Sequence, residues 1–302
     1  MTKELSPERW ATDLTLILNA TYKADRFPVK VKQLALDFSQ HKFPGDPITD
    51  VLDGSLRGFE GALHPAQNGK KGWGIIYNNA ISSSGRINFT IAHEFGHYLL
   101  HRLKYPGGIQ CTEEDMAIWD SNYNQIESQA NSFAANLLMP LDDFRKQIGP
   151  RIKPDLRMIG ICSDRYQTSL TASILRWLHY TERRSILVVS RDEFILWSRS
   201  SGPAFKTGAF FKTVDMPPIQ IPDKSLAAQR KVAEKNNGVL EIDAGVWLKE
   251  PCEEMVLFAD RYNFTISLLH LDEATSGFES NKENEPDAYD KIAYRTLGSS
   301  SV

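Results

Sequence analysis

The sequence predicts an α+β fold, because helical and strand-like patterns occupy different stretches of the chain. Up to Tyr180, apolar residues recur mostly at helical spacing, and two short strand-like runs interrupt them. From Ser185 onward, strand-like runs dominate, one of them at residues 239–247, and one helix, at residues 226–235, lies among them. A chain of 302 residues can hold two or three modules, so we expect boundaries after residues 142, 184 and 272.

The stretch before residue 142 is expected to be a helical domain with a small sheet. Helical spacing covers residues 6–22 and 29–38, and strand-like runs cover 58–63 and 72–78 with turn-forming residues between them. Residues 46–50 are rich in turn formers. Two further helices, residues 86–101 and 126–139, follow, and Pro140 ends the second one.

The helix at residues 86–101 contains His-Glu-Phe-Gly-His, an H-E-x-x-H pattern that places two imidazoles one turn apart. His93, Glu94, His97, His101 and Thr90 fall within a sector of about 100°. The rest of its circumference is almost entirely apolar, which is typical of a buried helix. Because a buried stripe of titratable groups is costly unless a partner satisfies it, the stripe predicts a metal site.

A zinc site needs a third protein ligand. His101 lies two turns from His93, about 12 Å along the helix axis, which is too far to share one ion with both other histidines. Glu127 is the better candidate, and Asn131, one turn further on, could orient a zinc-bound imidazole. Spacing alone leaves four competing carboxylates open: Glu113, Glu114, Asp115 and Asp120.

The stripe also supplies a candidate catalytic residue. Glu94 has no room to bind the ion beside His93, so we expect it to accept the proton of the attacking water as a general base. Two imidazoles and one carboxylate favour Zn²⁺ over manganese. Candidates for stabilising the oxyanion are His101, Tyr98 and Tyr123.

Two segments together resemble the paired signature of the ImmA/IrrE metallopeptidases. They are Thr-Ile-Ala-His-Glu-Phe-Gly-His-Tyr-Leu-Leu-His, ending at His101, and Glu-Ser-Gln-Ala-Asn-Ser-Phe-Ala-Ala-Asn-Leu-Leu-Met-Pro, beginning at Glu127. The resemblance implies that Glu127 is the third zinc ligand and that a small zincin-like peptidase packs its active-site helices on a short sheet. It also implies a substrate, a helix-turn-helix transcriptional repressor whose cleavage releases genes of mobile elements or of the DNA-damage response.

Cys111 lies on the loop between the two helices that carry the candidate ligands. A thiolate delivered to the open zinc position would keep the enzyme latent, because zinc prefers thiolate to water. Family members from anti-phage (CBASS-associated) operons resemble this arrangement, and the resemblance implies single-stranded DNA as the trigger. The alternative is an ordinary loop thiol.

Residues 145–191 hold ten Lys or Arg against three Asp or Glu, although the net charge of the chain is -3. Such a segment is either a solvated face or a footprint for nucleic acid. Residues 143–184 resemble the helix-turn-helix-like unit that follows the peptidase in this family, and residues 185–272 resemble its GAF-like sensor domain. Candidate contacts to a single strand are Arg176, Arg183 and Arg184, which lie beside aromatic residues.

Composition indicates the cellular compartment in which the protein is expected. No apolar run reaches the roughly 20 residues that would span a bilayer, and the N-terminus lacks a signal-peptide core. Three widely spaced cysteines do not form a disulfide framework, so we expect a cytoplasmic protein without a membrane partner. The acidic, apolar-poor residues 273–302 are expected to be disordered.

The leading interpretation is therefore a zinc endopeptidase that cleaves a repressor. One alternative is a metal-stabilised regulator that sequesters a transcription factor without cutting it, although a structural zinc site has no need of Glu94. Another is a standalone, toxin-like protease that degrades unstructured chains broadly.

Overall fold

The computed structural model describes residues 5–67, 70–110, 121–213 and 216–273. They form two compact units. Of the described residues, unit 1 comprises those up to Asp143 together with Ser163–Ser169, and unit 2 comprises Phe144–Cys162 and those from Leu170 to 273. Both units combine helices with a sheet, so the predicted α+β class is confirmed. The expected disordered tail lies outside the described residues.

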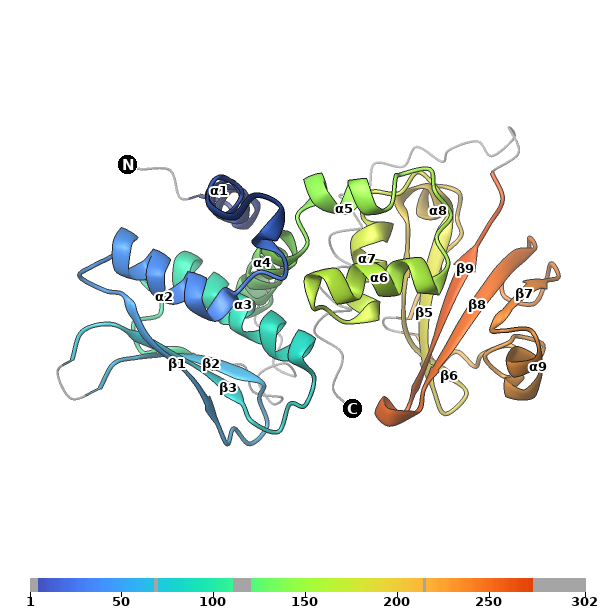
Figure 1. Cartoon of the computed structure of the whole chain (residues 1–302). Helices are drawn as coiled ribbons and strands as arrows, with labels where there is room; N and C mark the ends of the chain where they lie inside the picture. The colour runs from blue at the N-terminus through green and yellow to red at the C-terminus, as the bar shows by residue number, and fades with distance from the viewer. Residues whose placement is uncertain (1–4, 68–69, 111–120, 214–215, 274–302) are drawn as a thin grey trace. The chain divides into compact units, whose positions relative to one another are not determined.

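Unit 1 packs its helices against one four-stranded sheet of order β1-β3-β2-β4 (Figure 1). β1 and β3 are parallel, and β2 runs antiparallel to both of its neighbours. The elements are α1 (Pro7–Tyr22), the short η1 (Lys23–Arg26), α2 (Val31–Lys42), β1 (Ile48–Gly54), β2 (Gly61–Pro65), β3 (Trp73–Asn78), α3 (Ser84–Leu100), β4 (Ile109–Gln110) and α4 (Ser121–Leu138). α5 (Leu141–Gln147) crosses the division between the units.

One row of side chains joins this sheet to the helices. Val51, Ile75, Leu63 and Ile109 are register neighbours across the four strands, and each is at most 4% exposed. α2 packs on β1, and α3 packs on β2 and β3. The sheet therefore supports α3, the helix that carries the H-E-x-x-H pattern.

The strand β1 was not predicted, because only two of its seven residues, Ile48 and Val51, are buried. Thr49, Asp50 and Asp53 face solvent, so the stretch shows no clean alternation. Its pairing comes from β3, more than twenty residues further along the chain, and such a partner leaves no local signal.

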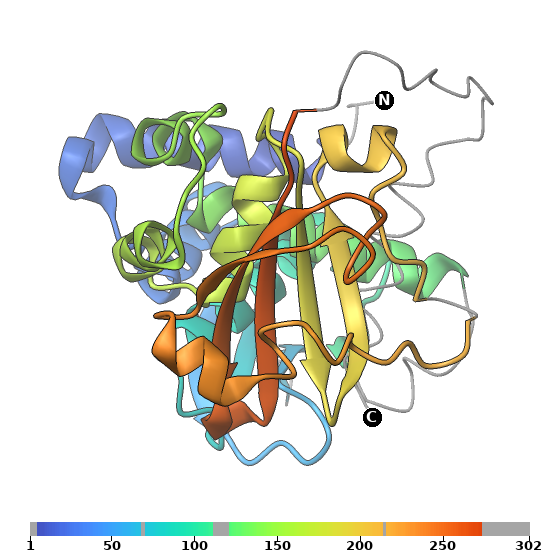
Figure 2. The ribbon, with the colours of Figure 1, turned by 90° about the vertical axis from the view of Figure 1, so that its right-hand side faces the viewer.

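Unit 2 is built on a five-stranded antiparallel sheet of order β6-β5-β9-β8-β7 (Figure 2). Its strands are β5 (Ser185–Arg191), β6 (Phe194–Ser200), β7 (Val239–Ile242), β8 (Cys252–Ala259) and β9 (Phe264–His270). Its helices are α6 (Leu156–Tyr166, whose last turn belongs to unit 1), α7 (Leu170–Leu178), α8 (Gly202–Lys206), α9 (Arg230–Lys235) and the short η2 (Asp260–Tyr262).

Two predicted elements of this region are shorter than expected. The strand expected at residues 239–247 ends at Ile242, and the helix expected at 226–235 begins at Arg230. Most of the segment 143–184 falls in unit 2. Its helix-turn-helix-like character and the GAF-like character of the following sheet stay predictions.

A fully buried carboxylate, Glu254, lies in the interior of unit 2 on β8. It accepts hydrogen bonds from the backbone N–H groups of Leu226 and Ala227, at 2.9 and 3.1 Å. The indole N–H of Trp247 donates at 2.7 Å and the hydroxyl of Ser267 at 2.9 Å. Four donors compensate the desolvation of this group.

A buried imidazole, His270, ends the central strand β9. Its Nε2–H donates to the carbonyl of Pro154 at 3.1 Å, and its Nδ1 accepts the hydroxyl proton of Ser185 at 2.8 Å. Burial lowers the pKa of His270 to about 4. The ring is therefore a neutral structural group.

Among the described residues, no helix is both long enough and apolar enough to cross a membrane.

Candidate metal centre

The crossing of α3 and α4 depends on a glycine inside the motif. A Cβ atom at Gly96 would lie 3.0 Å from Cδ1 of Phe133 and 3.2 Å from Cα of Ala130. Without that atom, the backbones of the two helices approach closely. Glu127 lies one turn before Ala130 on α4, so this close crossing brings its carboxylate to the histidines of α3.

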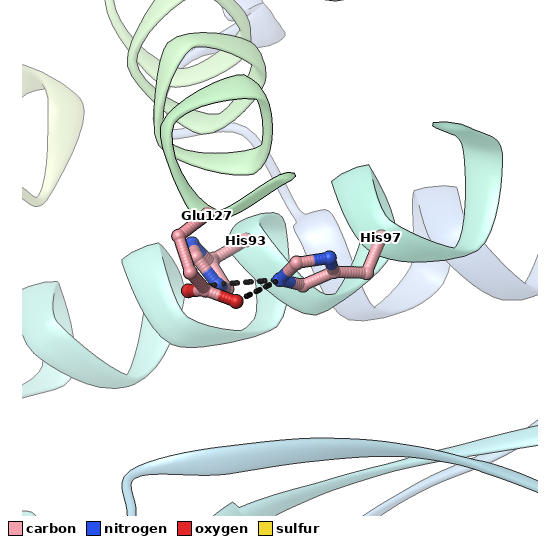
Figure 3. Close-up of side chains that lie close together, drawn as sticks. All are labelled: His93, His97 and Glu127. Atoms are coloured by element: carbon pink, nitrogen blue, oxygen red, sulfur yellow. Dashed lines mark hydrogen bonds and ion pairs between the residues drawn. The ribbon is translucent and has the colours of Figure 1, made fainter. Parts of the chain in front are cut away.

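Three side chains meet at this crossing (Figure 3). The Nε2 atoms of His93 and His97 are 2.9 Å apart. The two carboxylate oxygens of Glu127 lie 3.2 Å from Nε2 of His93 and 3.1 Å from Nε2 of His97. His97 is fully buried and His93 is 9% exposed. The structure thus brings together the three residues that the sequence nominated as ligands.

Each imidazole is held at its other nitrogen by a neighbouring side chain. Nδ1 of His93 lies 3.0 Å from Oδ1 of Asn131, and Nδ1 of His97 lies 3.0 Å from Nδ1 of His101. Nε2 of His101 lies 2.9 Å from Oε1 of Gln129. An amide oxygen can only accept, so His93 donates from Nδ1, and its neutral ring, the form that binds a metal, presents a lone pair at Nε2.

Glu94 is packed between the motif helix and the sheet. It is 2% exposed, and its Oε2 has no hydrogen-bond partner among the described residues. A Cβ atom at Gly61 of β2 would lie 2.8 Å from Oε1 of Glu94 and 2.6 Å from Cγ2 of Thr90. Burial raises the pKa of Glu94, His93 lowers it and Glu127 raises it again, so that the net pKa is about 8.

The charges of the cluster are strongly coupled. Burial alone would lower the pKa of His93, but the carboxylate of Glu127 outweighs it and raises the pKa to about 9. Burial lowers the pKa of His97 to about 4. For Glu127, burial is outweighed by His93 and His97, which lower the pKa of its carboxyl. Without a cation, one shared proton on His93 therefore offsets the charge of Glu127.

These residues fit a divalent transition metal. Two imidazole nitrogens and a carboxylate converge within 4.8 Å of one another, which is the donor set of a catalytic zinc site. The unpartnered oxygen of Glu94 lies in the same buried environment, where an uncompensated carboxylate costs several kcal/mol. A cation bound at the cluster would compensate that charge.

The residues predicted to stabilise the oxyanion, and the competing ligands, are not among the three side chains that form the cluster in the described structure. The hydroxyl of Tyr98 donates to the carbonyl of Asp46 at 2.7 Å, so its proton is already committed to another acceptor. Both ring nitrogens of His101 are committed to His97 and Gln129. Cys111 and the four competing carboxylates lie outside the described residues, as does the side chain of Tyr123.

The basic candidates are mostly interior. Arg176 and Arg184 are each 6% exposed, and Nη1 of Arg184 donates to Glu250 at 2.8 Å. Only Arg183 of the three is partly exposed. The described surface thus gives no support to nucleic-acid contacts by Arg176 and Arg184, and the contact by Arg183 stays a prediction.

Sequence reasoning missed Gln129, Gly61 and Gly96 as contributors to this site. Gln129 offered a weak signal, since it lies two residues after Glu127 on the same helix. The glycines offered none, because their role depends on which atoms approach them from other elements.

Unit 1 thus combines helices packed on a short sheet with a buried His-His-Glu cluster that could hold a metal ion. Residues 49–177, fewer than half of the chain, match the family model described as the IrrE N-terminal-like domain of peptidase family M78. This match supports the resemblance to the ImmA/IrrE family and spans both helices that carry the cluster. No curated protein matches the chain.

Proposed function

We propose that this protein is a zinc-dependent endopeptidase. One observation carries the proposal: His93, His97 and Glu127 converge beside the buried carboxylate of Glu94, which has an oxygen without a partner. A purely structural metal site would gain nothing from a buried carboxylate next to it. The match to a metallopeptidase-type family supports the same conclusion.

Each residue of the site has a distinct task in this proposal. His93, His97 and Glu127 hold the zinc ion, which would act as a Lewis acid when bound. Glu94 accepts a proton from the attacking water and delivers it to the leaving amine. Burial suits Glu94 to this task, because a carboxylate with a raised pKa takes up a proton readily near neutral pH.

The substrate and its control are further parts of the proposal. Support for a helix-turn-helix repressor as substrate comes from the family resemblance, as does support for a role in the DNA-damage or anti-phage response. Single-stranded DNA is the proposed trigger, and displacement of Cys111 from the zinc ion is the proposed activating step. Cys111 suits this role because it lies between the two ligand-bearing helices in the sequence and because zinc prefers thiolate to water.

Cleavage of a candidate repressor tests this function. Each small helix-turn-helix protein found among the neighbouring genes is incubated with zinc-loaded enzyme and single-stranded DNA, and products are identified by intact-mass spectrometry. Glu94→Gln should slow cleavage by about 10²- to 10⁴-fold, because it removes the general base. The control variant Glu182→Gln changes an exposed carboxylate and should cleave normally.

Zinc content distinguishes the possible failures. Glu94→Gln should still bind one zinc ion, since Glu94 is not a ligand. If it releases the repressor from its operator as fully as the unchanged protein does, without cutting it, the protein sequesters its partner and the peptidase proposal is wrong. Degradation of many unstructured chains at similar rates would instead favour a toxin-like protease.

A further inference from the structure

Two side chains beyond the metal ligands, the buried His101 and the partly buried Gln129, form a continuous path to His97. Nδ1 of His97 lies 3.0 Å from Nδ1 of His101, and Nε2 of His101 lies 2.9 Å from Oε1 of Gln129. His101 is 2% exposed and His97 is fully buried, so the hydrogen bond between these two rings is shielded from water. The path begins on α4 and ends at a ring on α3.

The chemistry of Gln129 gives this path a direction. Its amide oxygen can only accept, so the proton of the neutral His101 ring must be at Nε2. Nδ1 of His101 is then an acceptor, and the hydrogen bond with His97 requires a proton at Nδ1 of His97. The remaining nitrogen of His97, Nε2, keeps a free lone pair, and this is the atom that faces His93 and Glu127.

We propose that Gln129 and His101 are positioning residues that fix His97 in the tautomer able to bind a metal at Nε2. A neutral imidazole would otherwise divide its proton between its two nitrogens, and a proton at Nε2 would block the ligand position. For His93, a single hydrogen bond from Nδ1 to Oδ1 of Asn131 favours the same tautomer. For His97 the path has two steps because another imidazole lies between the ligand and the amide.

This role rests on the metal site of the proposed function, but it can be measured without any cleavage assay. Zinc affinity is measured by competition with a chromophoric chelator. Ring tautomers are read from long-range ¹H–¹⁵N spectra of the metal-free protein labelled with ¹⁵N-histidine. The protein has seven histidines, so the spectra contain few signals to assign. Neither readout depends on a substrate.

Three variants of the full chain separate positioning from simple packing. Gln129→Leu keeps the volume and removes the acceptor. Gln129→Glu keeps an acceptor-only group facing His101. Gln125→Leu makes the same chemical change at an exposed position on the same helix and serves as the matched control.

Gln129→Leu should weaken zinc binding by about 10- to 100-fold, as is usual when a partner of a metal-bound histidine is lost. The His97 ring of this variant should shift from protonation at Nδ1 toward a mixture of tautomers. Gln129→Glu and Gln125→Leu should bind zinc within about threefold of the unchanged protein and keep the His97 tautomer.

Equal zinc affinity and an unchanged His97 tautomer in Gln129→Leu would overturn the positioning role. So would an equal loss of affinity in Gln129→Glu, because only the packing around residue 129 would then matter. If the unchanged protein binds no zinc, the failure belongs to the proposed function and not to this path.

Discussion

Two buried carboxylates, one in each unit, differ in how completely their oxygens are hydrogen-bonded. Glu254 is fully buried and accepts four hydrogen bonds, from two backbone N–H groups, an indole and a hydroxyl. Glu94 is almost as buried, yet one of its oxygens has no partner among the described residues.

The difference distinguishes a structural carboxylate from a functional one. Donors that surround Glu254 on several sides hold it in place and leave no acceptor capacity for a ligand. Glu94 instead keeps an open acceptor next to two imidazoles and a second carboxylate, which together could hold a cation. Burial alone distinguishes neither group, whereas the oxygen without a partner beside the His-His-Glu cluster supports the role proposed for Glu94.

Metal binding should produce the largest contrast between the units. Zinc at about a thousand times its dissociation constant should raise the free energy of unfolding of unit 1 by about 4 kcal/mol, because only the folded cluster binds it tightly. Hydrogen exchange should slow most in α3 and α4, and much less in β8 and β9. His97→Ala is the control that should abolish this slowing. Equal slowing in α3 and α4 and in β8 and β9 would contradict the prediction.

A matched pair of substitutions tests the two carboxylates directly. Glu254→Gln should lower the free energy of unfolding by about 3 kcal/mol, because an amide NH₂ group would face donors that need an acceptor. Glu94→Gln should raise the stability of the metal-free protein by about 1 kcal/mol at pH 7, because it removes a buried acid without a full set of partners. Urea unfolding measures both, and a loss of stability in Glu94→Gln comparable to that of Glu254→Gln would remove the distinction.

His270 should make unit 2 sensitive to acid. Its pKa is about 4 in the folded chain and about 6.5 when unfolded, so below pH 6.5 the unfolded chain binds a proton that the folded chain does not. Stability is therefore present above pH 6.5 and should fall by about 2 kcal/mol between pH 7 and pH 5. Urea midpoints should show this loss, and it should be smaller in His270→Gln but unchanged in His41→Gln, which alters an exposed histidine. Equal pH dependence in all three proteins would contradict the assignment.

The sequence predicted the parts of the site that repeat along one helix. His93, Glu94 and His97 could be found because helical spacing alone puts them on one stripe. Glu127 was one of several carboxylates until the family resemblance singled it out, since nothing local shows how α4 crosses α3. Gln129 was missed because the direction of a hydrogen bond between helices is not a property of either helix.

The fold was predictable to a similar extent and for similar reasons. Helices such as α1 and α3 have an apolar periodicity that depends only on their own residues. The strand β1 has its partner more than twenty residues away and exposes most of its side chains, so no local pattern revealed it. Glu254 has no local signal either, because its four donors come from three other segments of the chain.

Gly96 has a consequence for transplanting this motif. It occupies one of the two positions that H-E-x-x-H leaves unspecified, yet the helix bearing the third ligand lies within 3.3 Å of where its side chain would begin. A designer who grafts two histidines and a glutamate onto another helical scaffold would need to keep a small residue there. Larger side chains would hold the second helix at a distance, and the carboxylate could no longer reach the imidazoles.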